Sequence, residues 1–434
     1  MLNELKSKIK DKTANIGIIG LGYVGLPLAV EFAKAGFTVT GFDTEEAKIS
    51  HIKKGESYIP DVLSKDVKDL VSSGKMKATS DKKLLNKMDV IIICVPTPLR
   101  KTKEPDISFI LAATEDINAN LRKGQLIVLE STTYPGTTEE VILPKLGGNG
   151  LKVGRDLYIA FSPERVDPGN PRYKTKDIPK VVGGVTKFCT EVTRLLYSQI
   201  IKEVIPVSNT RAAEMVKLLE NTYRIVNIGL INELALLCAK LGVDVWEIID
   251  AAKTKPFGFM PFYPGPGVGG HCISTDPHYL SWKARTYGFE TRFIELAEKI
   301  NSYMPHYVVD KIIGALNERK KSLKGSKILV VGITYKKDIN DIRESPALAV
   351  MNSLLEKEAK IQYHDPLVSD FEVDGLKLKS VDLTRENIGS SDCVVILTDH
   401  SKVDYKLIVD SANLIIDTRN VLKEFKGKNN IVKL

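Results

Sequence analysis

Long apolar runs are missing from this sequence: no segment is long and apolar enough to cross a bilayer. The lysine-rich start, Met1 to Lys12, lacks the apolar core of a secretory signal peptide. Short repeats and low-complexity segments are also missing. These absences argue against membrane, secreted and repeat proteins, so we expect a cytoplasmic protein without a membrane partner.

Cysteine is scarce, and the five cysteines form neither a C-x-x-C pair nor a metal-ligand spacing, so no metal site is expected. Cys94 and Cys393 lie in strand-like runs, and Cys238 lies in an apolar helical pattern. Cys189 opens an amphipathic helix. These four read as buried structural thiols. Only Cys272 has different surroundings.

Basic residues outnumber acidic ones, which gives a net charge of +8, but they form no stripe interleaved with aromatic residues. The densest clusters, Arg319 to Lys321 and Lys423 to Lys433, sit at the ends of expected elements and are typical of solvated surface. We therefore expect no nucleic-acid partner. A mild positive balance suits an anionic small-molecule substrate.

The length of 434 residues exceeds a single hydrophobic core, so two or three domains are expected. Strand-like and helix-like runs alternate in both halves, which predicts an α/β fold. We expect two Rossmann-like, doubly wound parallel-sheet domains joined by a long central helix and a small helical region. The predicted domains are 1–208, a central region 209–322 that contains the only cysteine outside the strand-like and helical patterns, and 323–434.

A glycine-rich turn, Gly20-Leu-Gly22-Tyr-Val-Gly25, follows the short apolar strand 15–19 and opens an apolar helix. The next strand ends in Asp43. This context matches a dinucleotide-binding fingerprint: the glycines let the backbone approach a pyrophosphate at the helix N-terminus, and the carboxylate accepts from the ribose hydroxyls. Because Asp43 would repel a 2′-phosphate, we expect NAD rather than NADP.

Hydroxyl-bearing residues follow two further strands of this half. Thr97 comes after the strand 90–95, and Thr132 comes after the strand 125–130. Ligands of such sheets bind beyond the carboxyl ends of the strands, where these hydroxyls would lie. The loop Phe161 to Asn170, which contains Glu164, follows another strand and is either part of the site or a solvated connection with an internal salt bridge.

One long helical pattern runs from Asn209 to Leu241 without proline. Glu214, Lys217 and Asn221 recur at i, i+3 and i+7 and share one face, while leucines occupy the other side. Such a helix connects domains or lies in a subunit interface. We therefore expect a homodimer or a higher homo-oligomer.

The segment Pro264 to Pro277 contains four glycines and three prolines, which predicts a loop rather than a helix or strand interior. It presents Cys272 with Asp276 a few residues on. The alternative is a structural turn whose cysteine is incidental. Helices over 245–252, 277–286 and 291–320 are expected to enclose the loop.

A second α/β pattern begins with the strand 327–331. The loop after it contains Lys336, and Arg343 follows before the helix 345–356. The loop after the last strand contains Arg419. Lys336 with its neighbour Lys337, and Arg343, suit phosphate groups.

Together these motifs resemble the UDP-glucose/GDP-mannose dehydrogenase family over essentially the whole chain. The matching pieces stand in family order: Gly20 to Gly25 with Asp43, Val95 to Pro98, Glu130 to Thr132, Ser162 to Arg165, Lys217 to Asn221, Gly269 to Asp276, Lys336 to Asp338, Arg343 to Ser345, and Arg419. The segments 162–170 and 255–272 look most like those of members that oxidise UDP-N-acetylglucosamine.

The resemblance implies that NAD oxidises the C6 hydroxyl of a UDP-N-acetylhexosamine twice, with UDP-GlcNAc as the first choice. Cys272 would attack the aldehyde to give a thiohemiacetal and then a thioester, which water hydrolyses. Lys217 would stabilise the oxyanion and Asn221 would donate a second hydrogen bond. Asp276 would couple to Lys217 and a water. Glu164 and Thr132 would position that water or accept a proton, and which group acts as the general base stays open.

The resemblance also implies the binding residues. Lys336 and Arg419 would hold the uridine diphosphate, and Arg343 would reach the cofactor's pyrophosphate. The expected cofactor-binding residues are Gly20, Gly22, Tyr23, Val24, Gly25, Asp43, Lys48, Thr97, Thr132 and Arg343. The expected substrate-binding residues are Glu164, Arg165, Val166, Lys217, Asn221, Tyr263, Gly269, Lys336 and Arg419.

Two positions depart from the pattern of UDP-glucose enzymes. His271 stands where those enzymes have a small residue, and it either tunes the thiol or packs against the loop. An arginine that relatives place upstream of the cysteine is absent, with Lys255 and Pro256 nearby. The sugar contacts made across a dimer therefore stay open.

Alternative functions also stay open. UDP-GalNAc, UDP-ManNAc and UDP-glucose differ from UDP-GlcNAc in ways that residue types do not resolve. The sequence also does not indicate in which pathway the product is used. A two-electron hydroxy-acid-type dehydrogenase would need neither Cys272 nor Lys336. A non-catalytic nucleotide-sugar-binding protein would be expected to lack Cys272, Lys217 or Asp276, and all three are present.

Overall fold

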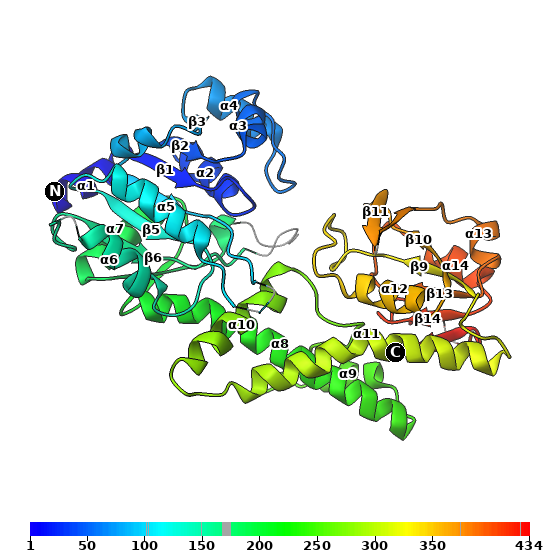
Figure 1. The fold of residues 1–434 in the computed structure, drawn as a ribbon. Coiled ribbons are helices and arrows are strands. Elements are labelled where there is room, and N and C mark those ends of the chain that lie inside the picture. Colours follow the sequence, from blue (N-terminus) through cyan, green and yellow to red (C-terminus); the bar gives the residue numbers. More distant parts are fainter. Residues whose placement is uncertain (101, 103, 149, 167–174, 374, 426) are drawn as a thin grey trace. The chain divides into compact units, whose positions relative to one another are not determined.

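The computed structural model describes residues 1–434 apart from 101, 103, 149, 167–174, 374 and 426, and apart from the side chains of residues 271 and 272. The chain forms two compact units. The first contains residues 1–220 and 278–289, and the second contains residues 221–277 and 290–434 (Figure 1). No helix within the described ranges is long and apolar enough to cross a membrane.

The first unit is built on an eight-stranded sheet with the order β3-β2-β1-β4-β5-β6-β7-β8. Strands β1 to β6 are parallel, and β7 is antiparallel to β6. Parallel neighbours need a long crossover, usually a helix. The described residues between β6 and β7 contain no α-helix, which accounts for this departure from a fully parallel sheet. The strands are β1 (Asn15–Ile19), β2 (Thr38–Phe42), β3 (Met76–Thr79), β4 (Val90–Ile93), β5 (Leu126–Leu129), β6 (Tyr158–Phe161), β7 (Lys180–Gly184) and β8 (Val204–Pro206).

Helices cover both faces of this sheet, as the doubly wound prediction requires. In β4, Ile92 packs in the core shared with α1, α2 and α7, while Ile91 and Ile93 pack in the core on the other face with α5 and α6. Alternation along a strand sends successive side chains to opposite faces, so an unbroken apolar run serves two cores. The helices are α1 (Leu2–Lys10), α2 (Gly25–Lys34), α3 (Glu46–Lys53), α4 (Ser64–Ser72), α5 (Ser108–Ala119), α6 (Leu143–Gly147) and α7 (Lys187–Tyr197), with short turns η1 (Lys82–Lys87), η2 (Thr138–Ile142) and η3 (Thr175–Asp177).

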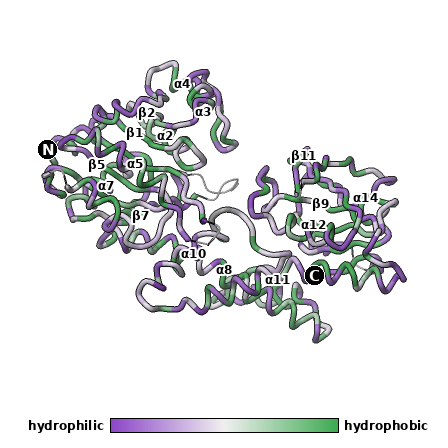
Figure 2. Tube along the Cα trace, viewed as in Figure 1, coloured by the Kyte–Doolittle hydropathy of each residue, from purple (hydrophilic) through white to green (hydrophobic). Residues whose placement is uncertain are grey.

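The long helix α8 covers Thr210–Leu241, close to the predicted span. From residue 221 on it belongs to the second unit, which also contains α9 (Val245–Ala252), the start of α10 (His271–Arg285) and all of α11 (Arg292–Glu318). Gly229 allows α8 to approach Ala297 of α11, and Asn232 donates to Asn301 at 2.8 Å. Green stretches along α8 and α11 in Figure 2 mark their apolar residues.

The second unit also holds a five-stranded sheet, entirely parallel, with the order β10-β9-β13-β14-β15. The chain leaves β9 toward β10 on one side and returns to β13 on the other. The prediction of a second doubly wound domain is therefore confirmed. The elements are β9 (Lys327–Val331), α12 (Pro346–Glu356), β10 (Lys360–His364), the hairpin β11 (Asp370–Val373) and β12 (Leu376–Lys379), α13 (Arg385–Gly389), β13 (Cys393–Ile396), α14 (Tyr405–Ser411), β14 (Ile415–Asp417) and β15 (Ile431–Lys433).

The prediction of a loop from Pro264 to Pro277 is wrong for the second half of that segment. Helix α10 begins at His271, six residues before the expected start at Pro277, and continues through that proline. The glycines end at Gly270, and the six residues from His271 to Asp276 contain neither glycine nor proline. The prediction rested on the glycine and proline content of the whole segment and so overlooked this run, which is long enough for more than one helical turn.

Candidate active site

The glycine-rich turn after β1 has the close backbone contacts that its sequence predicts. Gly20 has φ +91°, and a Cβ on it would lie 2.6 Å from the carbonyl oxygen of Cys94. A Cβ on Gly25 would lie 1.9 Å from the carbonyl oxygen of Gly20. Because any side chain would clash at both positions, the turn and the start of α2 pack together only with glycine.

Asp43 supports this turn from the end of β2. One carboxylate oxygen accepts from the N–H of Leu21 at 2.8 Å, and the other accepts from the N–H of Glu45 at 3.0 Å. Lys48 lies 3.8 Å away. Tyr58, which the sequence did not single out, donates to the carbonyl of Leu21 at 2.7 Å. Burial, followed by the charges of Asp43 and Glu45, raises the pKa of Tyr58, so its hydroxyl stays protonated as a donor.

A dinucleotide fits these residues. A Cβ on Gly22 would meet no atom within 4 Å, and the first turn of α2 has no side-chain cap at Val24. The uncapped N–H groups of a helix start suit a pyrophosphate. Tyr23 is about half exposed beside them. Thr97 is buried, and its carbonyl accepts from the hydroxyl of Tyr279.

We expect Asp43→Asn to raise the Kd for NAD⁺ about tenfold, because a hydrogen bond to a charged group contributes roughly 1.5–3 kcal/mol. The variant should also discriminate less against NADP⁺, because the repulsion of a 2′-phosphate is lost. Fluorescence titration with both cofactors measures this. Asp66→Asn, which removes the carboxylate that pairs with Lys34, is the control. An unchanged ratio of the two Kd values would tell against the ribose contact.

Glu164 lies in the loop after β6 and is almost fully enclosed. One of its oxygens accepts from the N–H groups of Arg165 at 2.8 Å and of Val166 at 2.7 Å. The other lies 3.3 Å from the ammonium of Lys180. Lys217 on α8 donates to the carbonyl oxygen of Glu164 at 2.8 Å. Two of the predicted catalytic residues, Glu164 and Lys217, are thus in direct contact.

Behind Glu164 lies a buried ionic group that the sequence analysis missed. Lys180, at the start of β7, contacts Glu130, which also accepts from the Tyr197 hydroxyl at 2.5 Å. The side chains of Lys180 and Glu130 are 6% and 0% exposed. A lysine opening an otherwise apolar strand was the available signal, because lysine is rarely buried unless it is paired.

The two carboxyl groups beside Lys180 have opposite pKa shifts. Burial raises the pKa of Glu130 to about 7, against the attraction of Lys180. Burial alone would also raise the pKa of Glu164, but Lys180, a hydrogen bond from Glu130 and the N–H of Val166 lower it to about 2. At neutral pH Glu164 is therefore a carboxylate, and Glu130, which contacts the same lysine, is about half protonated.

Arg165 is engaged in the internal salt bridge that the sequence left as an alternative. Its guanidinium lies 2.6 Å from the carboxylate of Glu220 and donates to the carbonyl of Pro179 at 2.6 Å. The segment from Asp167 to Asn170 lies outside the described residues.

The predicted polar face of α8 is enclosed rather than solvated. Glu214 is 1% exposed and accepts from Gly136 and Thr138. In the second unit, Asn221 donates to the carboxylate of Asp276 at 2.5 Å, and both side chains are buried. Position 272 is one turn before Asp276 on α10. The side chain of Cys272 lies outside the described part of the chain.

Within the second unit, the glycine run before α10 packs on the loops of the five-stranded sheet. A Cβ on Gly269 would lie 2.6 Å from the carbonyl oxygen of Glu344 and 2.8 Å from Tyr335. A Cβ on Gly265 would lie 2.9 Å from the guanidinium of Arg419. These glycines bring the chain that leads to position 272 against the residues predicted to bind the substrate nucleotide.

The predicted cations of this unit lie at the carboxyl ends of its strands. Arg419, after β14, donates to the carbonyl of Leu397 at 2.7 Å, and burial lowers its pKa. Lys336 lies in the turn after β9, and Arg343 is paired with Asp341 at 2.6 Å. Beside Arg419, the side-chain oxygen of Asn420 is buried without a hydrogen-bond partner among the described residues. Such an atom suits a ligand donor.

Tyr263 lies apart from these loops. Its ring stacks on Trp246 with centroids 5.8 Å apart, and its hydroxyl lies 3.3 Å from Asp250.

Three domains of one known family match the chain in order. The NAD binding domain of the UDP-glucose/GDP-mannose dehydrogenase family matches residues 14–201, its central domain matches residues 211–303, and its UDP binding domain matches residues 329–424. The chain belongs to this family. It is therefore an NAD-dependent dehydrogenase with a UDP binding domain.

Relatives within the UDP-glucose/GDP-mannose dehydrogenase family match nearly the whole chain. A UDP-N-acetyl-D-glucosamine 6-dehydrogenase of Pseudomonas aeruginosa is 38% identical over 82% of this chain and 84% of its own. A UDP-N-acetyl-D-mannosamine dehydrogenase of Methanococcus vannielii is 36% identical over 95% and 94%. The solved UDP-D-ManNAc dehydrogenase of Pyrococcus horikoshii is 33% identical, has a TM-score of 0.86 and covers 96% of this chain and 98% of its own.

Proposed function

We propose that this protein oxidises the C6 hydroxyl of a UDP-N-acetylhexosamine to the carboxylate, with UDP-GlcNAc as the first candidate. The observation that carries this proposal is the buried pair of Asn221 and Asp276 at 2.5 Å, one helical turn from position 272 on α10. A buried carboxylate held by an amide next to a cysteine position suits acyl chemistry on a thiol.

In this proposal bound NAD⁺ supplies the oxidising power for two successive two-electron oxidations. The Cys272 thiolate bonds to the carbonyl carbon of the aldehyde, and the resulting thiohemiacetal is oxidised to a thioester. The Lys217 ammonium stabilises negative charge on the carbonyl oxygen. Water then cleaves the thioester, which releases the sugar carboxylate and returns the thiolate. Asp276 and Glu164 orient that water or accept its proton.

The choice among sugars rests on the relatives. The names of the relatives divide between UDP-N-acetylglucosamine and UDP-N-acetylmannosamine. The Pseudomonas aeruginosa enzyme of the first group is 38% identical to this chain, and the Methanococcus vannielii enzyme of the second group is 36% identical. UDP-GalNAc and UDP-glucose remain alternative substrates, and a non-catalytic nucleotide-sugar-binding protein is the less favoured alternative.

The number of NADH molecules formed per sugar consumed tests the proposal. Incubation with UDP-GlcNAc, UDP-ManNAc, UDP-GalNAc and UDP-glucose in parallel should give about two NADH per sugar with one N-acetylated substrate, since an aldehyde held on the thiol is oxidised again before release. One NADH per sugar would favour a two-electron dehydrogenase. No NADH with any of them would favour a binding protein.

We further propose three domains, 1–208, 209–322 and 323–434, and a homodimer or higher homo-oligomer. The three matched segments of the family support the division. Exposed leucines at 230, 234, 237 and 241 follow one side of α8, and such apolar stripes are typical of subunit interfaces. Sedimentation equilibrium should give at least twice the 48.0 kDa chain mass, and a 48.0 kDa species at micromolar concentration would contradict the oligomer.

A further inference from the structure

A buried histidine lies between the loops of the second sheet, in contact with the turn that contains Lys336. His400 follows β13 and is 0% exposed. Its neighbours come from the turns after β9 and β10, and β9 and β13 are the two strands that adjoin where the chain reverses direction across the sheet. Ligands of doubly wound sheets bind at this reversal.

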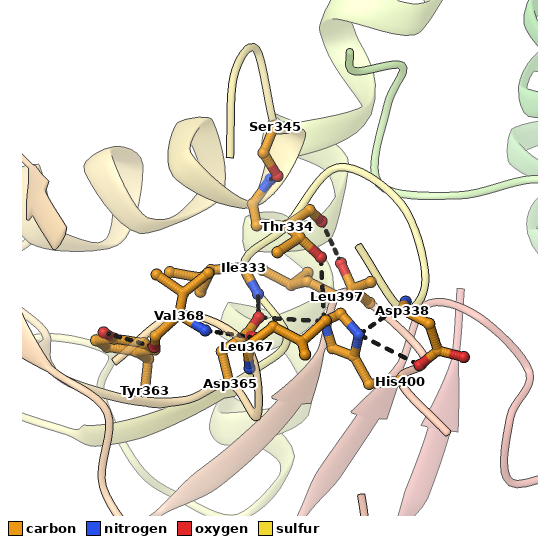
Figure 3. Close-up of polar contacts among 12 residues, drawn as sticks. Ile333, Thr334, Asp338, Ser345, Tyr363, Asp365, Leu367, Val368, Leu397 and His400 are labelled. Carbon is orange, nitrogen blue, oxygen red and sulfur yellow. Dashed lines mark hydrogen bonds and ion pairs between the residues drawn. The ribbon is translucent and has the colours of Figure 1, made fainter. Parts of the chain in front are cut away.

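The hydrogen bonds of His400 fix which ring nitrogen carries the proton. Its Nδ1 accepts from the backbone N–H of Asp338 at 3.0 Å and so carries none. Its Nε2 lies 3.1 Å from the carboxylate of Asp365 and 3.0 Å from the hydroxyl of Thr334 (Figure 3). The ring is therefore neutral, with Nε2–H donating to Asp365.

Asp365 anchors this arrangement from the end of β10. The oxygen that faces His400 also accepts from the N–H of Ile333 at 2.8 Å, and the other oxygen accepts from Leu367 at 2.9 Å. Burial would raise the pKa of Asp365, but the hydrogen bonds from His400, Ile333 and Leu367 outweigh it and lower the pKa. The carboxylate is thus a fixed acceptor.

The turn from Ile333 to Asp338 is held at both ends. Asp365 binds the N–H of Ile333 at the start, and His400 binds the N–H of Asp338 at the end. Asp338 has φ +57°, a conformation that costs most residues about 1 kcal/mol. Its carboxylate accepts from the N–H and hydroxyl of Ser401. Lys336 lies in the turn between these two hydrogen-bonded positions, Ile333 and Asp338.

We propose that His400 is a positioning residue for the nucleotide diphosphate: by joining the Asp365 carboxylate to the Asp338 N–H, it holds the turn that presents Lys336. This inference rests on the proposed role of Lys336 as a ligand of the uridine diphosphate. His400 does not touch the ligand, and it acts through the backbone of the turn. Its Nδ1 acceptor is the atom that matters for affinity.

Three substitutions separate the two nitrogens. In His400→Asn the amide oxygen can take the place of Nδ1 and accept from Asp338. In His400→Gln the amide nitrogen can take the place of Nε2 and donate to Asp365. His400→Leu keeps neither bond and has a similar size. We expect UDP titrated calorimetrically to bind His400→Asn within about threefold of wild type, and His400→Gln and His400→Leu at least about tenfold more weakly.

The KM for the UDP-sugar should follow the same order, while kcat and the Kd for NAD⁺ stay within about twofold, because the glycine turn and Asp43, which are expected to hold most of the cofactor, lie in the first unit. A purely structural role would lower stability and activity in all variants without distinguishing Asn from Gln. If His400→Leu does not fold, the UDP affinities of His400→Asn and His400→Gln still test the inference. Equal UDP affinity in Asn and Gln variants overturns the inference.

Lys336→Ala separates this inference from the function on which it rests. Weak UDP binding by Lys336→Ala, together with wild-type affinity in His400→Gln and His400→Leu, overturns the positioning role alone. Wild-type UDP affinity in Lys336→Ala overturns the assignment of Lys336 and the inference with it.

Discussion

Cys272→Ser should lower turnover by at least about a thousandfold while NAD⁺ and UDP-sugar still bind with unchanged Kd. Serine is a far weaker nucleophile at neutral pH, and an ester in place of a thioester would form too slowly to sustain the second oxidation. The binding residues lie on the glycine turn of the first sheet and on the loops of the second, so the substitution leaves them intact. Steady-state NADH production and calorimetric titrations measure the two effects.

Cys238→Ser is the matched control for this substitution. Cys238 is buried in α8 among Trp246 and Ile249, outside the proposed site, so the same change should cost stability but keep turnover. Full production of the sugar acid by Cys272→Ser would remove the thioester mechanism. Equal loss of turnover in both variants would mean that folding, rather than chemistry, was affected.

Lys180→Met should lower the free energy of unfolding by about 3–5 kcal/mol, because it leaves two buried carboxyl groups without their cation. Lys180 is 6% exposed and contacts both Glu130 and Glu164. Urea denaturation measures this loss. Lys202→Met is the control: Lys202 pairs with Asp177 but is 74% exposed, so its loss should change stability by less than about 1 kcal/mol.

The effect of Lys180→Met should depend on pH. Because the pKa of Glu130 in the fold is about 7 and its ordinary value is 4.5, the stability it contributes is full below 4.5 and lost as pH rises through 7. Without the attraction of Lys180 the pKa of Glu130 rises further, so ionising Glu130 at high pH costs more stability. The variant should therefore be more destabilised at about pH 8 than at about pH 5. The pKa of Glu164 should rise, which moves the acid side of the kcat profile to higher pH.

Lys180→Arg should restore both properties in large part, because a cation returns to the same place. A kcat profile of Lys180→Met identical to wild type, in a protein of unchanged stability, would show that this cation neither supports the fold nor keeps Glu164 ionised.

The sequence by itself determined the two sheets and the residues most directly tied to local backbone. Gly20 and Gly25 predict their turn because no other residue fits at those positions. Asp43 ends the next strand, at the distance from Gly25 that is typical of dinucleotide-binding folds. Apolar runs such as β4 are long enough to read as buried strands, and the proline-free span of α8 reads as one helix. These features depend on neighbours in sequence, which a single chain displays.

Only the tertiary structure decided which polar groups meet. Lys180 and Glu130 are 50 positions apart, and His400 and Asp365 are 35 apart, so no spacing along the chain relates them. The start of α10 at His271 was missed because the composition of fourteen residues outweighed six that contain neither glycine nor proline. Strands that lie far apart in sequence end at one edge of a sheet, and burial there leaves a charged side chain stable only beside the partner that the fold supplies.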